Sequence, residues 1–257
     1  MIYGILIMML AFIFRSIIAM SVGLITAFKT EFGRRRRVYK IDVPKNQIKK
    51  ELVQIAKIIP FYSFVVALGH YLGVVRYAEH TIVGTLATFA VLFVWNETWF
   101  YAFHRAVHHP KLMKVHVDHH RSRVTTPLTV SAFSFLEQTS HILLAVSVPA
   151  VLSRFIPITM VGVAVYSIPM IIVNVLGHMN VEVYPAWFSS SAFGKYIGTP
   201  TYHALHHGRV KGHYGLMTTI PDRLFGSYFE DYALVQARAA NGQGLTSLNE
   251  RLSLKVA

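Results

Sequence analysis

The chain has 257 residues, of which 53% are hydrophobic and only 14% are charged, and its mean hydropathy is +0.43. A soluble domain usually carries about 25% charged residues, so this composition predicts segments that face lipid. The net charge is +13, and the absence of cysteine excludes disulfides, thiolate zinc sites, thiolate-ligated haem and iron–sulfur clusters held by this chain.

Five apolar stretches are long enough to cross a bilayer, which needs about 20 helical residues. They are residues 2–28, 52–75, 81–103, 131–152 and 155–176. The first contains Arg15, which must reach the interface or find a partner. It resembles an uncleaved anchor, because no charged segment precedes it and no small-residue cleavage site follows it. We therefore predict an all-α integral-membrane bundle of about four or five membrane helices.

A strongly basic segment follows the first apolar stretch. From Lys29 to Lys50 there are nine Lys or Arg residues, against Glu31 and Asp42. Such a run also occurs in nucleic-acid-binding segments, but its place directly after an apolar stretch favours a cytoplasmic loop on anionic lipid. We expect the bilayer, and no nucleic acid, to be the partner of this segment.

The basic loop predicts the orientation of the chain. If it is cytoplasmic, the second stretch leaves the cytoplasm and the third returns, which makes residues 104–123 cytoplasmic. The fourth and fifth stretches form a hairpin near Ser153, so that His178 and the residues after it are cytoplasmic as well. A re-entrant hairpin gives the same sidedness.

Three units follow from this organisation. Residues 1–50 are predicted to be a membrane anchor with its basic cytosolic loop. Residues 51–230 form a membrane-embedded domain with a cytosolic, histidine-rich helical cap, and residues 231–257 form a loosely ordered tail.

Three histidine clusters lie outside the apolar stretches. Spacings of i, i+3 and i+4 on a helix put side chains on one face, and imidazole is a common ligand for iron, zinc, copper and nickel. Eight such histidines exceed the needs of one tetrahedral metal and fit two metals side by side. The clusters are His104-x3-His108, His116-x2-His119-His120 and His203-x2-His206-His207.

Two carboxylates are placed to support metal ligands. Glu97 lies two turns before His104 on the same helix face, where a carboxylate can orient a ligand imidazole. The alternative for Glu97 is a polar residue at a helix interface. Asp118, inside the second cluster, is predicted to play the same supporting role.

The other histidines have plainer interpretations. His109 is the immediate neighbour of His108 and points away from it, while His70 and His80 lie near the far side of the membrane and are interpreted as structural. His141 follows Glu137 by four residues in an apolar stretch. Such a pair is either mutually satisfied in lipid or part of a substrate channel.

The motifs resemble those of the fatty acid hydroxylase / sterol desaturase superfamily of integral-membrane, histidine-rich di-iron oxygenases. The resemblance covers about residues 90–230 and includes the three clusters and the ending Asp222-Arg223-Leu224-Phe225-Gly226-Ser227. Pro221 departs from it, since the family often has tryptophan before this aspartate. The resemblance also adds His178, after the last apolar stretch, and points to His213, where the family often has asparagine before Tyr-Gly. The implied metal ligands are His104, His108, His116, His119, His120, His178, His203, His206, His207 and His213.

The resemblance implies that two irons and O2 hydroxylate or desaturate a C–H bond of a membrane lipid, such as a fatty acyl chain or a sterol-like molecule. The chain has no Gly-rich dinucleotide motif, so electrons must come from an external carrier, such as a ferredoxin or a cytochrome b5-like protein with its reductase. Zinc binds imidazole clusters at least as tightly as ferrous iron and is therefore an artefactual occupant to expect in purified protein.

Two other functions are compatible with a histidine-rich membrane protein. A membrane metal-dependent hydrolase lacks support, because neither a serine-nucleophile motif nor a His-Glu-x2-His signature is present. A non-enzymatic metal transporter or sensor would need polar residues spread through several membrane segments. Here the histidines gather on one predicted side instead.

Overall fold

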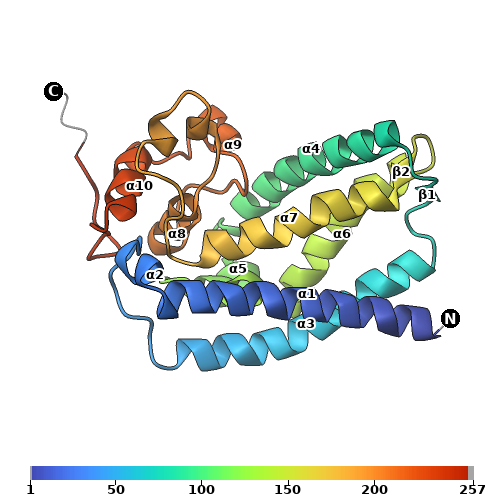
Figure 1. The fold of residues 1–257 in the computed structure, drawn as a ribbon, viewed down its shortest axis with the longest axis horizontal. Helices are drawn as coiled ribbons and strands as arrows, with labels where there is room; N and C mark the ends of the chain where they lie inside the picture. The colour runs from blue at the N-terminus through green and yellow to red at the C-terminus, as the bar shows by residue number, and fades with distance from the viewer. Residues whose placement is uncertain (1, 254–257) are drawn as a thin grey trace.

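The computed structural model describes residues 2–253, and five long helices make up most of it. They lie side by side along the long axis of the molecule (Figure 1), and each is long and apolar enough to cross a membrane. They are α1 (Ile2–Lys29), α3 (Gln47–Tyr71), α4 (Ile82–Val107), α6 (Phe135–Leu152) and α7 (Met160–His178). The predicted all-α membrane bundle is confirmed.

The remaining elements lie at the two ends of this bundle. Figure 1 shows the two short parallel strands, β1 (Tyr77–Ala78) and β2 (Ile158–Thr159), at one end and a helical cap at the other. The shorter elements at the cap end are α2 (Glu31–Arg35), α5 (Met113–His120), η1 (Thr129–Ser131), η2 (Phe188–Ser190), η3 (Gly194–Tyr196), α8 (Pro200–Arg209), α9 (Ile220–Leu224) and α10 (Tyr232–Ala240).

Helices α4 and α7 begin in the same way at the strand end. Each has a threonine N-cap, Thr81 or Thr159, whose side chain accepts a hydrogen bond from the backbone of a glycine three residues later. A Cβ added to Gly162 would lie 2.5 Å from Cβ of Thr88, so glycine lets the two helices touch. The Thr88 hydroxyl accepts a hydrogen bond from the backbone N–H of Thr159 at 3.0 Å. These contacts fix α4 and α7 parallel, with Thr88 level with Gly162.

Helix α1 packs against α7 in the same direction. A Cβ on Gly23 would lie 2.8 Å from Cγ1 of Val175, so Gly23 is level with Val175. Helices α1, α4 and α7 therefore all run from the strand end to the cap (Figure 1).

Helix α3 begins earlier than the apolar stretch predicts. Its first turn is polar, but Gln47 and Glu51 are buried against the loop that follows α5. The Nε2 of Gln47 donates a hydrogen bond of 2.8 Å to the carbonyl of Val124. Contacts outside the membrane, which hydropathy does not register, set this helix start.

The C-terminal segment is ordered as far as it is described, so the predicted loose tail is wrong for residues 231–253. Tyr232, Val235 and Ala239 recur at helical spacing and are fully buried in the cap core. Leu245 is also fully buried, and its N–H donates to the carbonyl of Val38 at 2.7 Å. The glycines and alanines around residue 240 suggested disorder, while the apolar periodicity before them indicated a packed helix. Residues 254–257 lie outside the described residues.

A buried ion pair joins α8 to α10. The guanidinium of Arg209 donates two hydrogen bonds, of 2.6 and 2.7 Å, to the carboxylate of Asp231. Both residues are more than nine-tenths buried. Because both charges are buried together, removing either partner alone leaves an unpaired buried charge and strongly destabilises the fold.

We predict that Asp231→Ala lowers the free energy of unfolding by about 3–5 kcal/mol, because Arg209 is left buried without its anion. The matched control is Glu31→Ala, which breaks an exposed pair with Arg35 (3.7 Å) and should cost less than about 1 kcal/mol. Denaturant unfolding of the full-length protein in micelles measures both values. Equal losses for the two variants would contradict the role given to this ion pair.

Candidate metal centre

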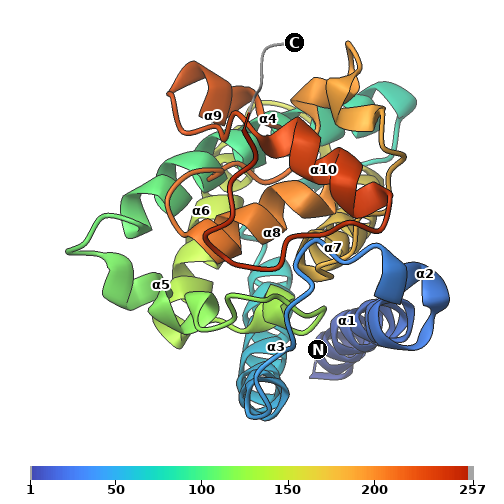
Figure 2. The same cartoon turned by 90° about the vertical axis from the view of Figure 1, so that its left-hand side faces the viewer.

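Nine histidines converge where the cap meets the bundle. In each of two groups, one ligand atom from every member lies within 4.8 Å of all the others. Figure 2 looks onto the cap and shows α8 surrounded by the elements that supply the other histidines. The first group is His104, His108, His116, His120 and His206, and the second is His119, His178, His203 and His207.

Helical spacing divides each His-x2-His-His cluster between the two groups. On α5, His116 and His120 are one turn apart and enter the first group, while His119 enters the second. Helix α8 does the reverse, since His203 and His207 enter the second group and His206 the first. The same motif on two facing helices therefore builds two neighbouring sites. Rings of the two groups stack directly, with 4.6 Å between the ring centroids of His120 and His207.

Main-chain carbonyls fix the orientation of several rings. The Nδ1 of His104 bonds to the carbonyl of Tyr214 at 2.9 Å, and the Nδ1 of His206 bonds to that of Gly212 at 2.8 Å. In the second group, Nδ1 of His178 and of His207 bond to the carbonyls of Asn174 and Ser122. A carbonyl only accepts, so each Nδ1 must carry the proton, and each Nε2 presents a lone pair to its group.

These lone pairs face one another without a proton between them. The Nε2 atoms of His104 and His116 are 3.1 Å apart, and both rings have their Nδ1 committed, to the Tyr214 carbonyl and to the Glu137 carboxylate. Two lone pairs at this distance repel, whereas a cation bound by both would attract them. The donor set therefore fits transition-metal ions that accept imidazole nitrogen, one in each group.

Burial keeps these imidazoles neutral, which is the form that binds metal. Desolvation, followed by the neighbouring imidazoles, lowers the pKa of His116, His119 and His120 well below the ordinary value. The same causes lower the pKa of His203, His206 and His207, and burial lowers the pKa of His108 to about 3. The half-buried His108 makes no hydrogen bond through either ring nitrogen among the described residues, so either nitrogen is free to present the single lone pair of the neutral ring.

Glu137 supports the site directly, which the sequence analysis missed. Its carboxylate bonds to Nδ1 of His116 rather than pairing with His141. Ser134, the N-cap of α6, fixes the start of this helix by accepting from the Glu137 N–H at 3.2 Å. The available signal in the sequence was an acid near the start of an apolar stretch.

The two carboxylates predicted to support the ligands lie elsewhere. Glu97 accepts hydrogen bonds from the N–H groups of Met217 and Thr218 and from the Thr218 hydroxyl, at 3.1, 2.9 and 2.7 Å. It holds the loop after Tyr214 rather than an imidazole. Asp118 pairs with Arg121 at 2.9 Å on the partly exposed side of α5.

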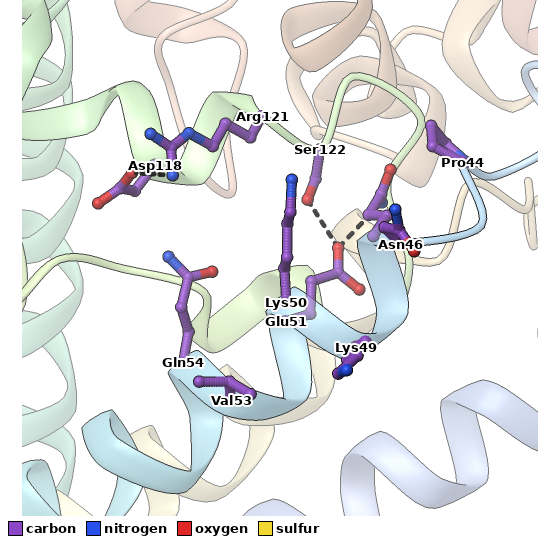
Figure 3. A pocket seen from close by; sticks show the side chains of 11 residues that line it. Pro44, Asn46, Lys49, Lys50, Glu51, Val53, Gln54, Asp118, Arg121 and Ser122 are labelled. Atoms are coloured by element: carbon purple, nitrogen blue, oxygen red, sulfur yellow. Dashed lines mark hydrogen bonds and ion pairs between the residues drawn. The ribbon is translucent and has the colours of Figure 1, made fainter.

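Three further carboxylates hold the backbone segments that carry the histidines. Glu51 accepts from the hydroxyls of Ser122, Thr126 and Thr129 at 2.6–2.7 Å, and Figure 3 shows Glu51 and Ser122 pointing toward one another. Fully buried Glu182 accepts from the hydroxyls of Thr199 and Thr201 at the start of α8.

Asp222, on α9, holds the loop that precedes this helix. It accepts from the N–H groups of Tyr214 and Gly215 at 2.9 and 2.7 Å. The carbonyl of Tyr214 is the partner of His104, so Asp222 acts on that ring through the backbone.

His213 lies outside both groups. Its Nδ1 donates to the carbonyl of Tyr202 at 3.1 Å, and its Nε2 accepts from the N–H of Phe229 at 2.9 Å. Since both ring nitrogens are engaged, we remove His213 from the proposed ligand set. The exposed His109 is not in either group, as expected.

We predict about two bound metal ions per chain after reconstitution with ferrous iron or zinc, measured by mass spectrometry of the metal. Glu137→Gln should weaken one of them by about 10–100-fold, because His116 loses the carboxylate that orients it. His213→Asn should retain both ions, since asparagine tolerates the positive φ of 55° at this position. Metal loss in His213→Asn, or none in Glu137→Gln, would contradict this assignment.

We predict that the metal-free protein loses stability as the pH falls below about 6.5, where histidines of the unfolded chain take up protons that the buried ones refuse. The loss extends over the pH range between the pKa of histidine in the unfolded chain, about 6.5, and the lowered pKa in the folded chain, which for His108 is about 3. The midpoint temperature of thermal unfolding should be lower at pH 5.5 than at pH 7.5. His109→Ala, at an exposed position, is the control and should leave the slope unchanged. A midpoint that is constant or rises would be inconsistent with buried neutral imidazoles.

Comparison with known proteins identifies the family. The chain matches the fatty acid hydroxylase family over residues 89–227, more than half of its length. It is 28% identical over 222 residues to the Delta(7)-sterol 5(6)-desaturase erg3C of Aspergillus fumigatus, covering 77% of this chain and 67% of the relative. It is 32% identical over 135 residues to the very-long-chain aldehyde decarbonylase GL1-4 of Oryza sativa subsp. indica, covering 51% of this chain and 22% of the relative.

The chain is also 32% identical over 132 residues to the protein CER1-like 2 of Arabidopsis thaliana, and this match covers 50% of this chain and 21% of the relative. The chain thus spans about a fifth of the length of these plant relatives. No solved structure matches the chain. All nine converging histidines, and Asp222, lie within the matched residues. This chain therefore belongs to the fatty acid hydroxylase family.

Proposed function

We propose that this protein is a di-iron oxidoreductase that hydroxylates or desaturates a C–H bond of a membrane lipid with O2. The observation that carries the proposal is the pair of imidazole groups at the inner end of a membrane cavity. Nine neutral nitrogen donors without any thiolate suit iron, zinc or copper. The family assignment favours iron among these.

A cavity inside the membrane bundle ends close to the metal groups. It has a volume of about 390 Å³, and it lies among α1, α3, α4, α6 and α7. At the cap end its wall includes Phe100 and Phe133. Phe133 stacks on His119 with 4.6 Å between ring centroids, and Phe100 meets His104 edge-on at 5.0 Å. A lipid in this cavity would be separated from the histidines by one aromatic layer.

The iron pair, when bound, supplies the activation of O2 and the removal of hydrogen from an unactivated C–H bond. In hydroxylation, one oxygen atom enters the C–H bond and the other leaves as water, with two electrons and two protons consumed. In desaturation, two hydrogens leave the lipid and both oxygen atoms end as water, with the same demand for electrons and protons. The protein contributes the dry, aromatic-walled approach and the fixed imidazoles.

Electrons are proposed to arrive from the aqueous side. The basic segment 29–50 lies at the same end of the bundle as the metal groups (Figure 1), which by the positive-inside rule supports a cytoplasmic site. Beside α5, a surface depression of about 820 Å³ is lined by Lys49 and Lys50, and by Arg121 in its ion pair with Asp118 (Figure 3). This charge suits a transient, salt-sensitive encounter with an acidic carrier such as a ferredoxin or a cytochrome b5-like protein.

The alternative functions have less support. A hydrolase or a metal sensor would not need nine ligands and an apolar cavity that ends at them. The Aspergillus fumigatus relative, whose match covers 77% of this chain, is described as a sterol desaturase, which agrees with C–H oxidation.

We predict that cells expressing the chain accumulate a lipid that is heavier by one oxygen or lighter by two hydrogens, and only in the presence of O2. His119→Ala and His206→Ala, one from each group, should reduce product at least about 100-fold, because each removes a metal ligand. Lipid mass spectrometry after labelling with heavy oxygen gas measures the product. His109→Ala is the matched control and should retain activity. Product that persists in both ligand variants would rule out this function.

A further inference from the structure

The membrane cavity contains polar groups that the proposed oxidation does not use. Each of the five long helices contributes one stripe of side chains to its wall. Among the described residues, four buried polar atoms on this wall have no hydrogen-bond partner. They are Nε of Arg15, Nδ2 of Asn96, Nε1 of Trp99 and the hydroxyl of Tyr166.

All four of these atoms can donate a hydrogen bond. Buried donors without acceptors destabilise a protein, most of all within the hydrocarbon region, where no water replaces the missing partner. Three of them, on Arg15, Asn96 and Trp99, can only donate, while the Tyr166 hydroxyl can also accept. Such a set is complementary to an oxygen-rich acceptor and not to an apolar chain. The head of the molecule that fills this cavity should therefore carry acceptor oxygens.

The helix register places three of these residues near one level. Helices α1 and α7 are parallel with Gly23 level with Val175, so Arg15 lies two turns back, level with Ser167 and beside Tyr166. Helices α4 and α7 are parallel with Thr88 level with Gly162, which puts Asn96 about one turn closer to the cap than Tyr166.

Arg15 adds a positive charge to this level. Its guanidinium carbon lies 5.1 Å from the centroid of the Phe12 ring, and no salt bridge to Arg15 occurs among residues 2–253. The three acids on the other long helices, Glu51, Glu97 and Glu137, are engaged by Ser122, Thr218 and His116, respectively. A cation inside a membrane protein is normally paired, so the missing anion should come from the ligand.

We propose that the cavity binds a single-chain lipid anion, with its carboxylate among Arg15, Tyr166 and Asn96 and its tail directed toward Phe100 and Phe133. The volume of about 390 Å³ lies within the range of roughly 300–1,000 Å³ of small-molecule sites. Arg15 lies outside residues 89–227, so the family match assigns it no role.

This geometry also selects the carbon that reacts, an inference that rests on the proposed function. Tyr166 lies roughly 18 Å along α7 from His178, at 1.5 Å per residue. The carboxylate is thus held far from the metal groups, and oxidation falls on the distal part of the chain rather than beside the head.

The test is equilibrium binding to the full-length protein in nanodiscs at pH 8, read by displacement of a fluorescent fatty acid. Palmitate should bind at least about tenfold more tightly than hexadecanol, which has the same chain without the charge. Arg15→Gln should abolish this preference, Arg15→Lys should retain part of it, and Tyr166→Phe should weaken palmitate by about tenfold. Arg34→Gln removes an exposed cation outside the cavity and should change nothing.

Equal affinity for palmitate and hexadecanol in the unaltered protein would overturn the proposal, as would a preference that survives Arg15→Gln. If Arg15→Gln fails to fold, the unaltered protein and the Tyr166→Phe variant, which keeps the ring, decide the outcome by themselves. Binding requires neither O2 nor electrons. Failure of lipid oxidation would therefore leave this result intact, and failure of binding would leave the oxidation test intact.

Discussion

The structure depends on one constraint: buried imidazoles must be held with their lone pairs turned toward one another. Neutral rings gain nothing from this arrangement by themselves, since two facing Nε2 lone pairs repel. The energy that holds them comes from the outer side of five rings, those of His104, His116, His178, His206 and His207, where Nδ1 donates to a carbonyl or to Glu137. The metal-free site is therefore strained in its centre and stabilised at its edge, as expected of a site prepared for cations.

The edge of the site needs support from a second set of groups, the buried carboxylates. Three of the carbonyls that hold the rings, those of Ser122, Gly212 and Tyr214, belong to loops, and loops are more mobile than the helices they connect. Glu51 fixes the loop of Ser122, and Asp222 fixes that of Tyr214. Each carboxylate satisfies several donors at once, so the cost of burying its charge is offset locally. The three acids Glu51, Glu182 and Asp222 thereby fix the backbone segments that position the histidines.

The sequence predicted those features that depend on local spacing. Apolar length predicted the five membrane helices, and the i, i+3, i+4 pattern predicted eight of the nine converging histidines, while His178 came from the family resemblance. The sequence could not predict which carboxylate meets an imidazole, because Glu97 and Glu137 both precede histidines in apolar stretches and only the packing of α6 against α5 separates them. The availability of the His213 nitrogens likewise depends on the backbone of residues 202 and 229, far away in sequence. The packed tail was missed because composition outweighed the weaker periodicity of Tyr232, Val235 and Ala239.

The residues inside the family match and those outside it have different structural roles. The family match, residues 89–227, contains every ligand and the loops around them, whereas α1 and α3 lie outside it. These two helices nevertheless form part of the cavity wall, and α3 contributes Glu51, which holds the Ser122 loop after the second histidine cluster. Metal chemistry needs one fixed geometry, so its residues tolerate little change. The far wall of the cavity only has to match a lipid, and Arg15 on α1 gives that wall a charge that the metal-binding part of the chain does not dictate.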